Sequence, residues 1–142
     1  MKKILFITIV CTTVIFAACD NKPAVTTERK TINPAPVKTY DEVVKSEETT
    51  DTFNVALYET KFTFKYLIKI NFKGIEATDS LRIPNLGYAP QPEIKKGTAV
   101  RPSCIVGFLD DKNQFMEANE VKFEDNKLKF HTIKSYDVTE GE

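Results

Sequence analysis

Residues 62–73 read FTFKYLIKINFK, and the spacing of their apolar side chains indicates the class of fold. Every even position from Phe62 to Phe72 is apolar, while the odd positions are polar or basic apart from Leu67. Alternation with a period of two is typical of a β-strand that buries one face and leaves the other in solvent. The solvated face forms a basic strip that carries Lys65, Lys69 and Lys73.

Shorter segments on both sides repeat this pattern. Phe53, Val55 and Leu57 alternate before the strip, with Glu59-Thr60 as a candidate turn, and residues 75–83 alternate after it around a central Asp79. No long apolar pattern with helical spacing follows residue 53. Further strands are expected at residues 104–109, 115–123 and 128–132, and turns between them at residues 110–113 and 124–127. Residues 133–138 are expected to continue the last strand after a bulge.

These segments predict an all-β protein, a small antiparallel β-sandwich or barrel of six or seven strands. The chain has 142 residues, which favours a single domain. It carries 20 Lys+Arg against 20 Asp+Glu, and a balanced charge argues against a dedicated nucleic-acid binder. We therefore expect no nucleic acid among its partners.

The beginning of the chain has the features of an export signal. Lys2 and Lys3 precede the mostly apolar stretch ILFITIVCTTVIF, residues 4–16. A helix of that length spans roughly 20 Å, which is short of the hydrocarbon core of about 30 Å. The stretch is therefore typical of a signal-peptide core rather than a membrane-spanning anchor.

Residues 16–19, Phe-Ala-Ala-Cys, resemble the lipobox of bacterial lipoproteins. The resemblance implies that residues 1–18 are removed as a lipoprotein signal peptide and that Cys19 is acylated. Each acyl methylene that enters the bilayer contributes about 0.8 kcal/mol, so several chains anchor a protein firmly. The alternative is an ordinary signal peptide cut after Ala18, with Cys19 incidental.

Two features of the sequence bear on whether the anchor lies in the inner or the outer membrane, and they point in different directions. Asp20 resembles the inner-membrane retention signal of enterobacterial lipoproteins, whereas the Lys-, Asn- and Thr-rich composition resembles lipoproteins of Bacteroidetes, in which that signal does not apply. The composition favours the outer membrane, with either the periplasmic or the surface leaflet open.

Residues 19–52 differ in composition from the rest of the chain. They are rich in Thr and contain Pro23, Pro34 and Pro36 but no Gly. Such a segment buries too little apolar surface to offset its chain entropy, so it is predicted to be a lipidated flexible tether. A short helical turn at residues 40–45 is the one exception expected. The folded domain is then residues 53–138, and 139–142 form a frayed acidic tail.

Residues 84–97 form the longest irregular stretch of the predicted domain, with three Pro, Tyr88, Lys95 and Lys96. Loops longer than about 12 residues often serve binding. The stretch is either a stiffened recognition loop or a Pro-rich crossover between two sheets.

Few residues in the chain suggest catalysis. Cys104 lies in an apolar run and is expected to be a buried, inert thiol, the alternative being a nucleophile paired with His131, itself expected to be exposed. Asp110, Asp111 and Asn113 lack the spacing of a calcium loop, so a hairpin turn is favoured there. Asp79-Ser80-Leu81 resembles the O-glycosylation site of exported Bacteroidetes proteins, with Ser80 as acceptor.

The sequence therefore predicts a lipid-anchored, non-enzymatic protein-binding or assembly module of the cell envelope, with no metal and no cofactor. The alternatives are a small-ligand or glycan-binding surface lipoprotein in which Tyr88 lines a pocket, and a hydrolase with Cys104 or a carboxylate in an open cleft. The candidate contact residues are Tyr88, Lys95, Lys96, Lys65, Lys69 and Lys73.

Overall fold

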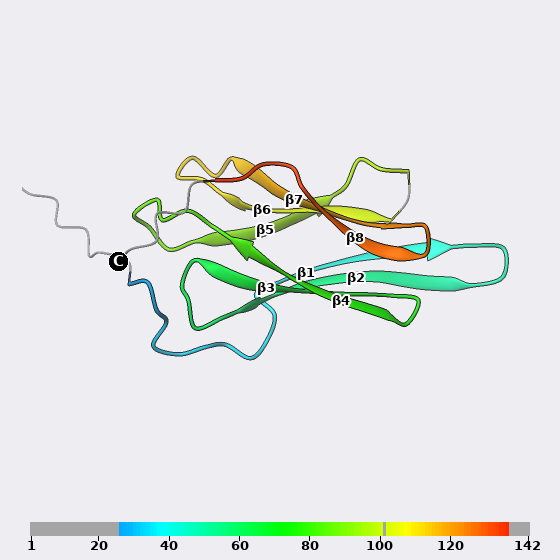
Figure 1. Ribbon diagram of the computed structural model, residues 1–142, viewed down its shortest axis with the longest axis horizontal. Coiled ribbons are helices and arrows are strands. Elements are labelled where there is room, and N and C mark those ends of the chain that lie inside the picture. The colour runs from blue at the N-terminus through cyan, green and yellow to red at the C-terminus, as the bar shows by residue number, and fades with distance from the viewer. Residues whose placement is uncertain (1–25, 101, 137–142) are drawn as a thin grey trace, which may run out of the picture.

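The computed structural model describes residues 26–100 and 102–136, and within them the chain forms eight β-strands and no helix (Figure 1). The all-β class is as predicted, with eight strands in place of six or seven. The strands are β1 (Lys38–Lys45), β2 (Thr50–Glu59), β3 (Lys65–Phe72), β4 (Ile75–Arg82), β5 (Gln91–Lys96), β6 (Ser103–Leu109), β7 (Phe115–Glu124) and β8 (Lys127–Thr132).

The strands form two antiparallel sheets of four, in the orders β1-β2-β3-β4 and β5-β6-β7-β8. Each strand pairs with its neighbour in the sequence, so both sheets are meanders, and residues 83–90 cross from one to the other. The β3–β4 and β7–β8 hairpins close through two-residue turns, Lys73-Gly74 and Asp125-Asn126, whose φ angles are all positive, from 52° to 72°. Such turns match the right-handed twist of the strands that they join.

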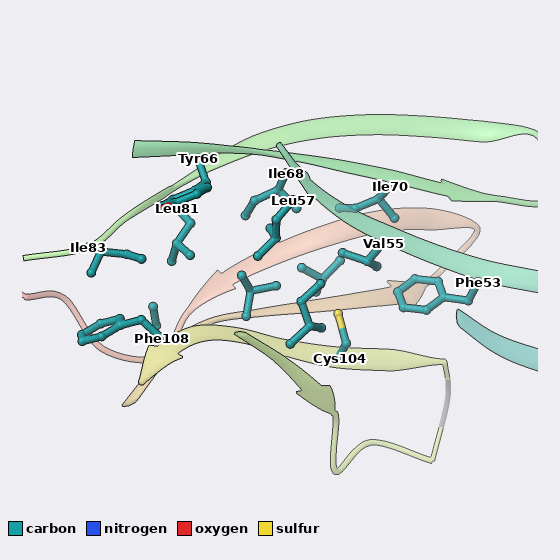
Figure 2. Packing of buried hydrophobic residues seen from close by; sticks show 14 of the residues in the cluster. Phe53, Val55, Leu57, Tyr66, Ile68, Ile70, Leu81, Ile83, Cys104 and Phe108 are labelled. Atoms are coloured by element: carbon teal, nitrogen blue, oxygen red, sulfur yellow. The ribbon is translucent and has the colours of Figure 1, made fainter. Parts of the chain in front are cut away.

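The two sheets bury one continuous core between their facing surfaces (Figure 2). Phe72 links the layers, because its ring lies edge-to-face with Phe53 at 5.8 Å in its own sheet and with Phe123 at 4.8 Å in the other. The alternation in residues 66–72 is confirmed, since the even positions are buried. The core comprises Phe53, Val55, Leu57, Tyr66, Ile68, Ile70, Phe72, Leu81, Ile83, Ile94, Cys104, Val106, Phe108, Ala118 and Val121.

The prediction of a flexible tether is wrong for residues 38–52. Residues 38–45 are neither flexible nor helical but form β1, which pairs with β2 from Lys38↔Leu57 to Lys45↔Thr50. Tyr40 and Val44 on the inner face pack against the core, and Tyr40 meets the ring of Phe53 at 6.5 Å. The segment folds because β2 offers a hydrogen-bonding edge to it, which composition alone does not reveal.

Three other boundaries differ from the sequence prediction. Residues 62–64 belong to the β2–β3 connection, and β3 begins only at Lys65. Part of the expected 84–97 loop is β5, so the irregular connection is residues 83–90. β8 ends at Thr132, and Tyr136 instead packs on Phe108 with a ring distance of 5.0 Å. The signal peptide, Cys19, Val138 and the acidic tail lie outside the described residues.

Edge strands β1 and β5 are joined across the layers by charged side chains. Lys38 Nζ lies 2.8 Å from a Glu93 carboxylate oxygen, and Lys96 Nζ lies 3.7 Å from Glu42. Burial raises the pKa of Glu93, but the hydrogen bonds from Lys38 and the Ile94 N–H outweigh it, so the net pKa shift is downward. Charged residues at sheet edges, together with Pro92, hinder pairing with further strands.

Candidate docking surface

The outer face of the first sheet carries two lysines of the predicted basic strip. Tyr66 and Ile68 of β3 point into the core, so Lys65, Leu67 and Lys69 point outward. Lys69 Nζ lies 4.7 Å from the centre of the Tyr58 ring on β2. Neither lysine forms an ion pair with any carboxylate of the described residues. We call Tyr58, Lys65, Leu67 and Lys69 the docking face.

The carboxylates at the margin of this face are engaged by amides. Asn54 Nδ2 donates to Asp41 at 2.6 Å, and Asn71 Nδ2 donates to Glu76 at 3.3 Å. Beside Lys65 the surface is hollowed by a shallow depression of about 360 Å³, lined by Thr60, Lys65, Tyr66, Leu67, Thr78, Asp79 and Ser80. The docking face thus combines two uncompensated cations, an aromatic ring and an apolar side chain.

Two outward lysines of the second sheet, Lys122 and Lys129, are placed differently, because they lie among carboxylates. Lys122 Nζ lies 3.9 Å from Glu120 and 3.7 Å from Glu124, and Lys129 Nζ lies 3.1 Å from Glu124. The hydrogen bond from Lys129, with the charges of Lys122 and Lys129, lowers the pKa of Glu124. Lys65 and Lys69 thus differ from Lys122 and Lys129 in having no carboxylate at ion-pair distance among the described residues.

The remaining candidate contacts do not join this surface, so the six predicted residues are not one site. Lys73 lies in the β3–β4 turn, with its Nζ 5.6 Å from the Phe72 ring. Lys95 lies on the second sheet, 4.5 Å from the Phe115 ring, and Lys96 pairs with Glu42. Of the six, only Lys65 and Lys69 share the outer face of β3, because Lys73 lies in the turn after it and Lys95 and Lys96 lie on the other sheet.

Tyr88 lies in the connection between the sheets. Its hydroxyl is covered and has no hydrogen-bond partner among the described residues. Burial raises the pKa of Tyr88, and the nearby carboxylates of Asp111 and Asp110 raise it further. Ser80 is half-buried on β4, opposite Leu67, and its N–H donates to Asp79 Oδ1 at 2.7 Å.

Cys104 is buried and His131 is exposed, as the sequence predicts. Cys104 is fully buried, and burial followed by the charges of Glu42 and Glu120 raises its pKa to about 12. The thiol is thus protonated at neutral pH, while His131 lies exposed on β8. Within residues 26–100 and 102–136 no group of three His, Cys, Asp or Glu side chains could hold a metal ion. In the same ranges no helix has the length and apolarity to cross a bilayer.

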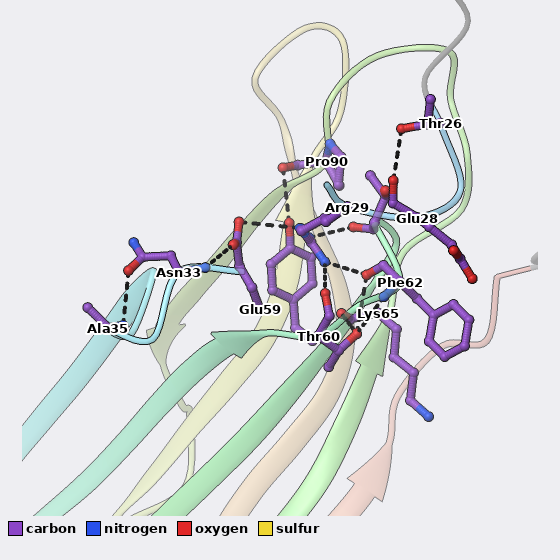
Figure 3. A network of polar contacts seen from close by, with 12 residues as sticks. Thr26, Glu28, Arg29, Asn33, Ala35, Glu59, Thr60, Phe62, Lys65 and Pro90 are labelled. Carbon is purple, nitrogen blue, oxygen red and sulfur yellow. Dashed lines mark hydrogen bonds and ion pairs between the residues drawn. The ribbon is translucent and has the colours of Figure 1, made fainter. Parts of the chain in front are cut away.

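Sequence reasoning missed a clasp formed by Arg29, which lies in the predicted tether (Figure 3). Its guanidinium donates to the Thr60 carbonyl at 2.8 Å, the Thr63 carbonyl at 2.6 Å and the Phe62 carbonyl, and Nε lies 3.3 Å from Glu59. The guanidinium also lies over the Tyr66 ring at 4.7 Å. Only 10% of the Arg29 side chain is exposed, so the clasp is largely covered.

Backbone contacts extend the clasp along the segment. The Arg29 N–H donates to the Lys61 carbonyl at 2.8 Å, and the Thr63 N–H donates to the Thr27 carbonyl at 2.9 Å. The Asn33 N–H donates to Glu59 at 2.8 Å. A lone arginine in a Thr- and Pro-rich segment has no periodic signal, and its partners lie about thirty positions away, so the sequence gives no sign of this docking.

Comparisons of the chain with protein-family models, with curated proteins and with solved structures give no significant match. Its function is therefore inferred from its own residues and their geometry.

Proposed function

We propose that the protein is a lipid-anchored, non-enzymatic module of the cell envelope that binds an acidic surface of another envelope protein through the docking face. The observation that carries this proposal is the contrast between two pairs of lysines, one pair on each sheet. Lys65 and Lys69 have no carboxylate partner within the described residues, whereas Lys122 and Lys129 are surrounded by carboxylates.

The composition of the docking face suits an acidic protein partner. Complementary charge steers association and excludes wrong partners more than it adds affinity. Tyr58 supplies a rigid aromatic surface under the Lys69 ammonium, and Leu67 lies between the two lysines along β3. Aromatic side chains and partly buried lysine stems supply the apolar contact area that charge alone lacks.

The anchor in this proposal is Cys19, acylated after removal of residues 1–18. Its support is the lipobox-like sequence Phe-Ala-Ala-Cys behind a short apolar stretch. We propose the outer membrane as the site, with the docking face offered to a partner in the same envelope.

Charge reversal tests the docking face. We expect the Lys65→Glu/Lys69→Glu variant to lose an envelope partner that co-purifies with the natively lipidated protein in mild detergent. The matched control is Lys122→Glu/Lys127→Glu, which changes the net charge equally on the second sheet. Equal recovery of the partner with both variants, or loss with both, would contradict the assignment of the face.

A second candidate function, small-ligand or glycan binding, rests on Tyr88, whose covered hydroxyl lacks a hydrogen-bond partner within the described residues. A ligand that displaces part of the 83–90 crossover would reach this hydroxyl and satisfy it with a polar group. Under this reading Tyr88→Phe weakens binding in a glycan screen while the Lys65→Glu/Lys69→Glu variant binds normally. No difference between Tyr88→Phe and the unchanged protein would argue against it.

A further inference from the structure

Five segments meet at one end of the molecule, at the left in Figure 1. They are residues 26–37, the β2–β3 connection, the 83–90 crossover, the β6–β7 turn and residues 133–136. We call this the entry end, because the described chain begins there. Four large hydrophobic side chains from four of these segments are exposed: Ile32 (51%), Phe62 (42%), Leu86 (46%) and Ile133 (41%).

Exposed apolar side chains alone do not select this end, since Val43, Ile75 and Val100 are exposed elsewhere. The docked chain provides the second observation. The Arg29 clasp fixes the backbone of residues 27–29 against the β2–β3 connection through the bonds Arg29 N–H to Lys61 and Thr63 N–H to Thr27. The chain toward Cys19 therefore leaves the domain at the entry end.

The remaining connection to Cys19 is short. Seven residue steps separate Cys19 from Thr26. A fully extended chain covers at most about 3.6 Å per residue, so this connection spans no more than about 25 Å. A free tether of residues 20–52 would have a contour length several times greater. With Cys19 acylated, the entry end is therefore held close to the bilayer, and the opposite end points away.

We propose that the entry end rests on the lipid bilayer, with Phe62, Leu86, Ile32 and Ile133 contacting the interfacial region. This inference rests on the proposed acylation of Cys19. Two lysines at this end suit the boundary between acyl chains and headgroups: Lys61 Nζ lies 4.8 Å from the Phe62 ring, and Lys134 Nζ lies 5.1 Å from the Tyr136 ring. Such pairs place an apolar body beside a cation that reaches lipid phosphates.

Net charge is not what holds this end to lipid. The β6–β7 turn brings Asp110 and Asp111 to the same end as Lys30, Lys61 and Lys134. The contact is then mainly apolar and depends only weakly on the share of anionic lipid. Because the strands run along the long axis (Figure 1), the docking face lies on the side of a molecule that stands on the membrane.

Tryptophan variants test the orientation directly, because the chain contains no Trp. The natively lipidated Phe62→Trp protein is placed in phosphatidylethanolamine–phosphatidylglycerol vesicles whose acyl chains carry bromine, a contact quencher of indole emission. The matched control is Ile75→Trp, at an exposed position (38%) beside the β3–β4 turn of the opposite end. We expect strong quenching and a blue shift for Phe62→Trp and neither for Ile75→Trp.

The Arg29→Ala substitution in the Phe62→Trp protein tests the clasp. Release of the segment lengthens the connection, so we expect most of the quenching to be lost while the unfolding midpoint shows that the sheets remain folded. Unchanged quenching in Arg29→Ala overturns the role of the clasp. Equal quenching, or none, at positions 62 and 75 overturns the proposed orientation.

Vesicle flotation separates these failures from failure of the anchor. If the unchanged protein floats with vesicles and Cys19→Ser does not, the anchor holds, and the quenching result judges the orientation alone. If the unchanged protein does not float, both the anchor and this inference fail. The docking face is judged separately by the Lys65→Glu/Lys69→Glu variant.

Discussion

Arg29 bonds three backbone carbonyls that lie between β2 and β3. The carbonyls of Thr60, Phe62 and Thr63 lie in the β2–β3 connection and accept from its guanidinium. The planar guanidinium of arginine carries five N–H donors in fixed directions spread over several atoms, whereas the three donors of a lysine ammonium all lie on one nitrogen and cannot span the same set of carbonyls.

We expect Arg29→Lys to release the segment that it holds. Removing a bonded partner from a covered carbonyl costs about 1–3 kcal/mol, so local opening becomes tens of times more frequent. The Thr63 amide proton, bonded to the Thr27 carbonyl, then exchanges with solvent correspondingly faster. Hydrogen exchange followed by NMR measures this exchange rate. The control is the Lys30→Ala variant, which changes the exposed neighbour of Arg29 and leaves the guanidinium in place. Equal protection in Arg29→Lys and the control would contradict the clasp.

Cys104 makes stability depend on alkaline pH. The cysteine thiol of an unfolded chain has a pKa of about 8.5, whereas burial raises the pKa of Cys104 in the folded protein to about 12. Between these values the unfolded chain has lost a proton that the folded chain keeps. The free energy of unfolding therefore falls as pH rises, by up to about 1.4 kcal/mol per pH unit.

Denaturant titrations at a series of pH values measure this slope, with Cys104→Ala as the comparison. In that variant we expect the free energy of unfolding to stay constant until the tyrosines of the unfolded chain ionise at about pH 10. Burial and the hydrogen bond to Glu42 raise the pKa of Tyr40 to about 12, so a fall above pH 10 remains in both proteins. Identical slopes between about pH 8.5 and 10 would contradict the burial of the thiol.

At the scale of strands, predictability follows the number of apolar residues on the inner face. β3 has four buried inner residues in strict alternation, and β6 is almost wholly buried, so both are evident in the sequence. The Asp79 that interrupts the β4 pattern lies at a sheet edge, where a half-exposed carboxylate is tolerated. These central elements are predictable because their own side chains form the core.

β1 and β5 are not predictable in the same way. β1 places only Tyr40 and Val44 against the core, with Glu42 between them, and β5 contributes Pro92 and Ile94. Each is an edge strand, with a ladder partner on one side only. The same holds for the candidate site. The outward direction of Lys65 and Lys69 follows from the β3 alternation, whereas the absence of an ion pair to either lysine within the described residues follows only from the folded structure.

Truncation tests at which residue the folded domain begins. We expect a protein that starts at Phe53, the predicted domain boundary, to unfold or aggregate, because it lacks β1 and the first three residues of β2. It would also leave the backbone groups of β2 that bond β1 without partners. A protein that starts at Thr26 should melt cooperatively like the mature chain. Equal melting temperatures for the two truncations, measured by circular dichroism, would contradict the contribution of β1.

At the scale of the whole molecule, the two meanders give the protein two unlike faces and two unlike ends. On the first sheet Lys65 and Lys69 have no carboxylate partner within the described residues, whereas Lys122 and Lys129 of the second sheet lie among carboxylates. The clasped segment directs the chain toward Cys19 from one end only. In the proposed arrangement the lipid anchor fixes the entry end, and the docking face stands accessible along the side.

The central claim is that the docking face binds one acidic envelope protein. The most direct measurement is crosslinking mass spectrometry on the natively lipidated protein in its own membranes, with a reagent that joins lysines to carboxylates. We predict crosslinks from Lys65 and Lys69 to acidic residues of a single envelope protein, and none to that protein from Lys122 or Lys127. Crosslinks confined to Lys122 and Lys127, or an isolated monomer without crosslinks, would contradict the claim.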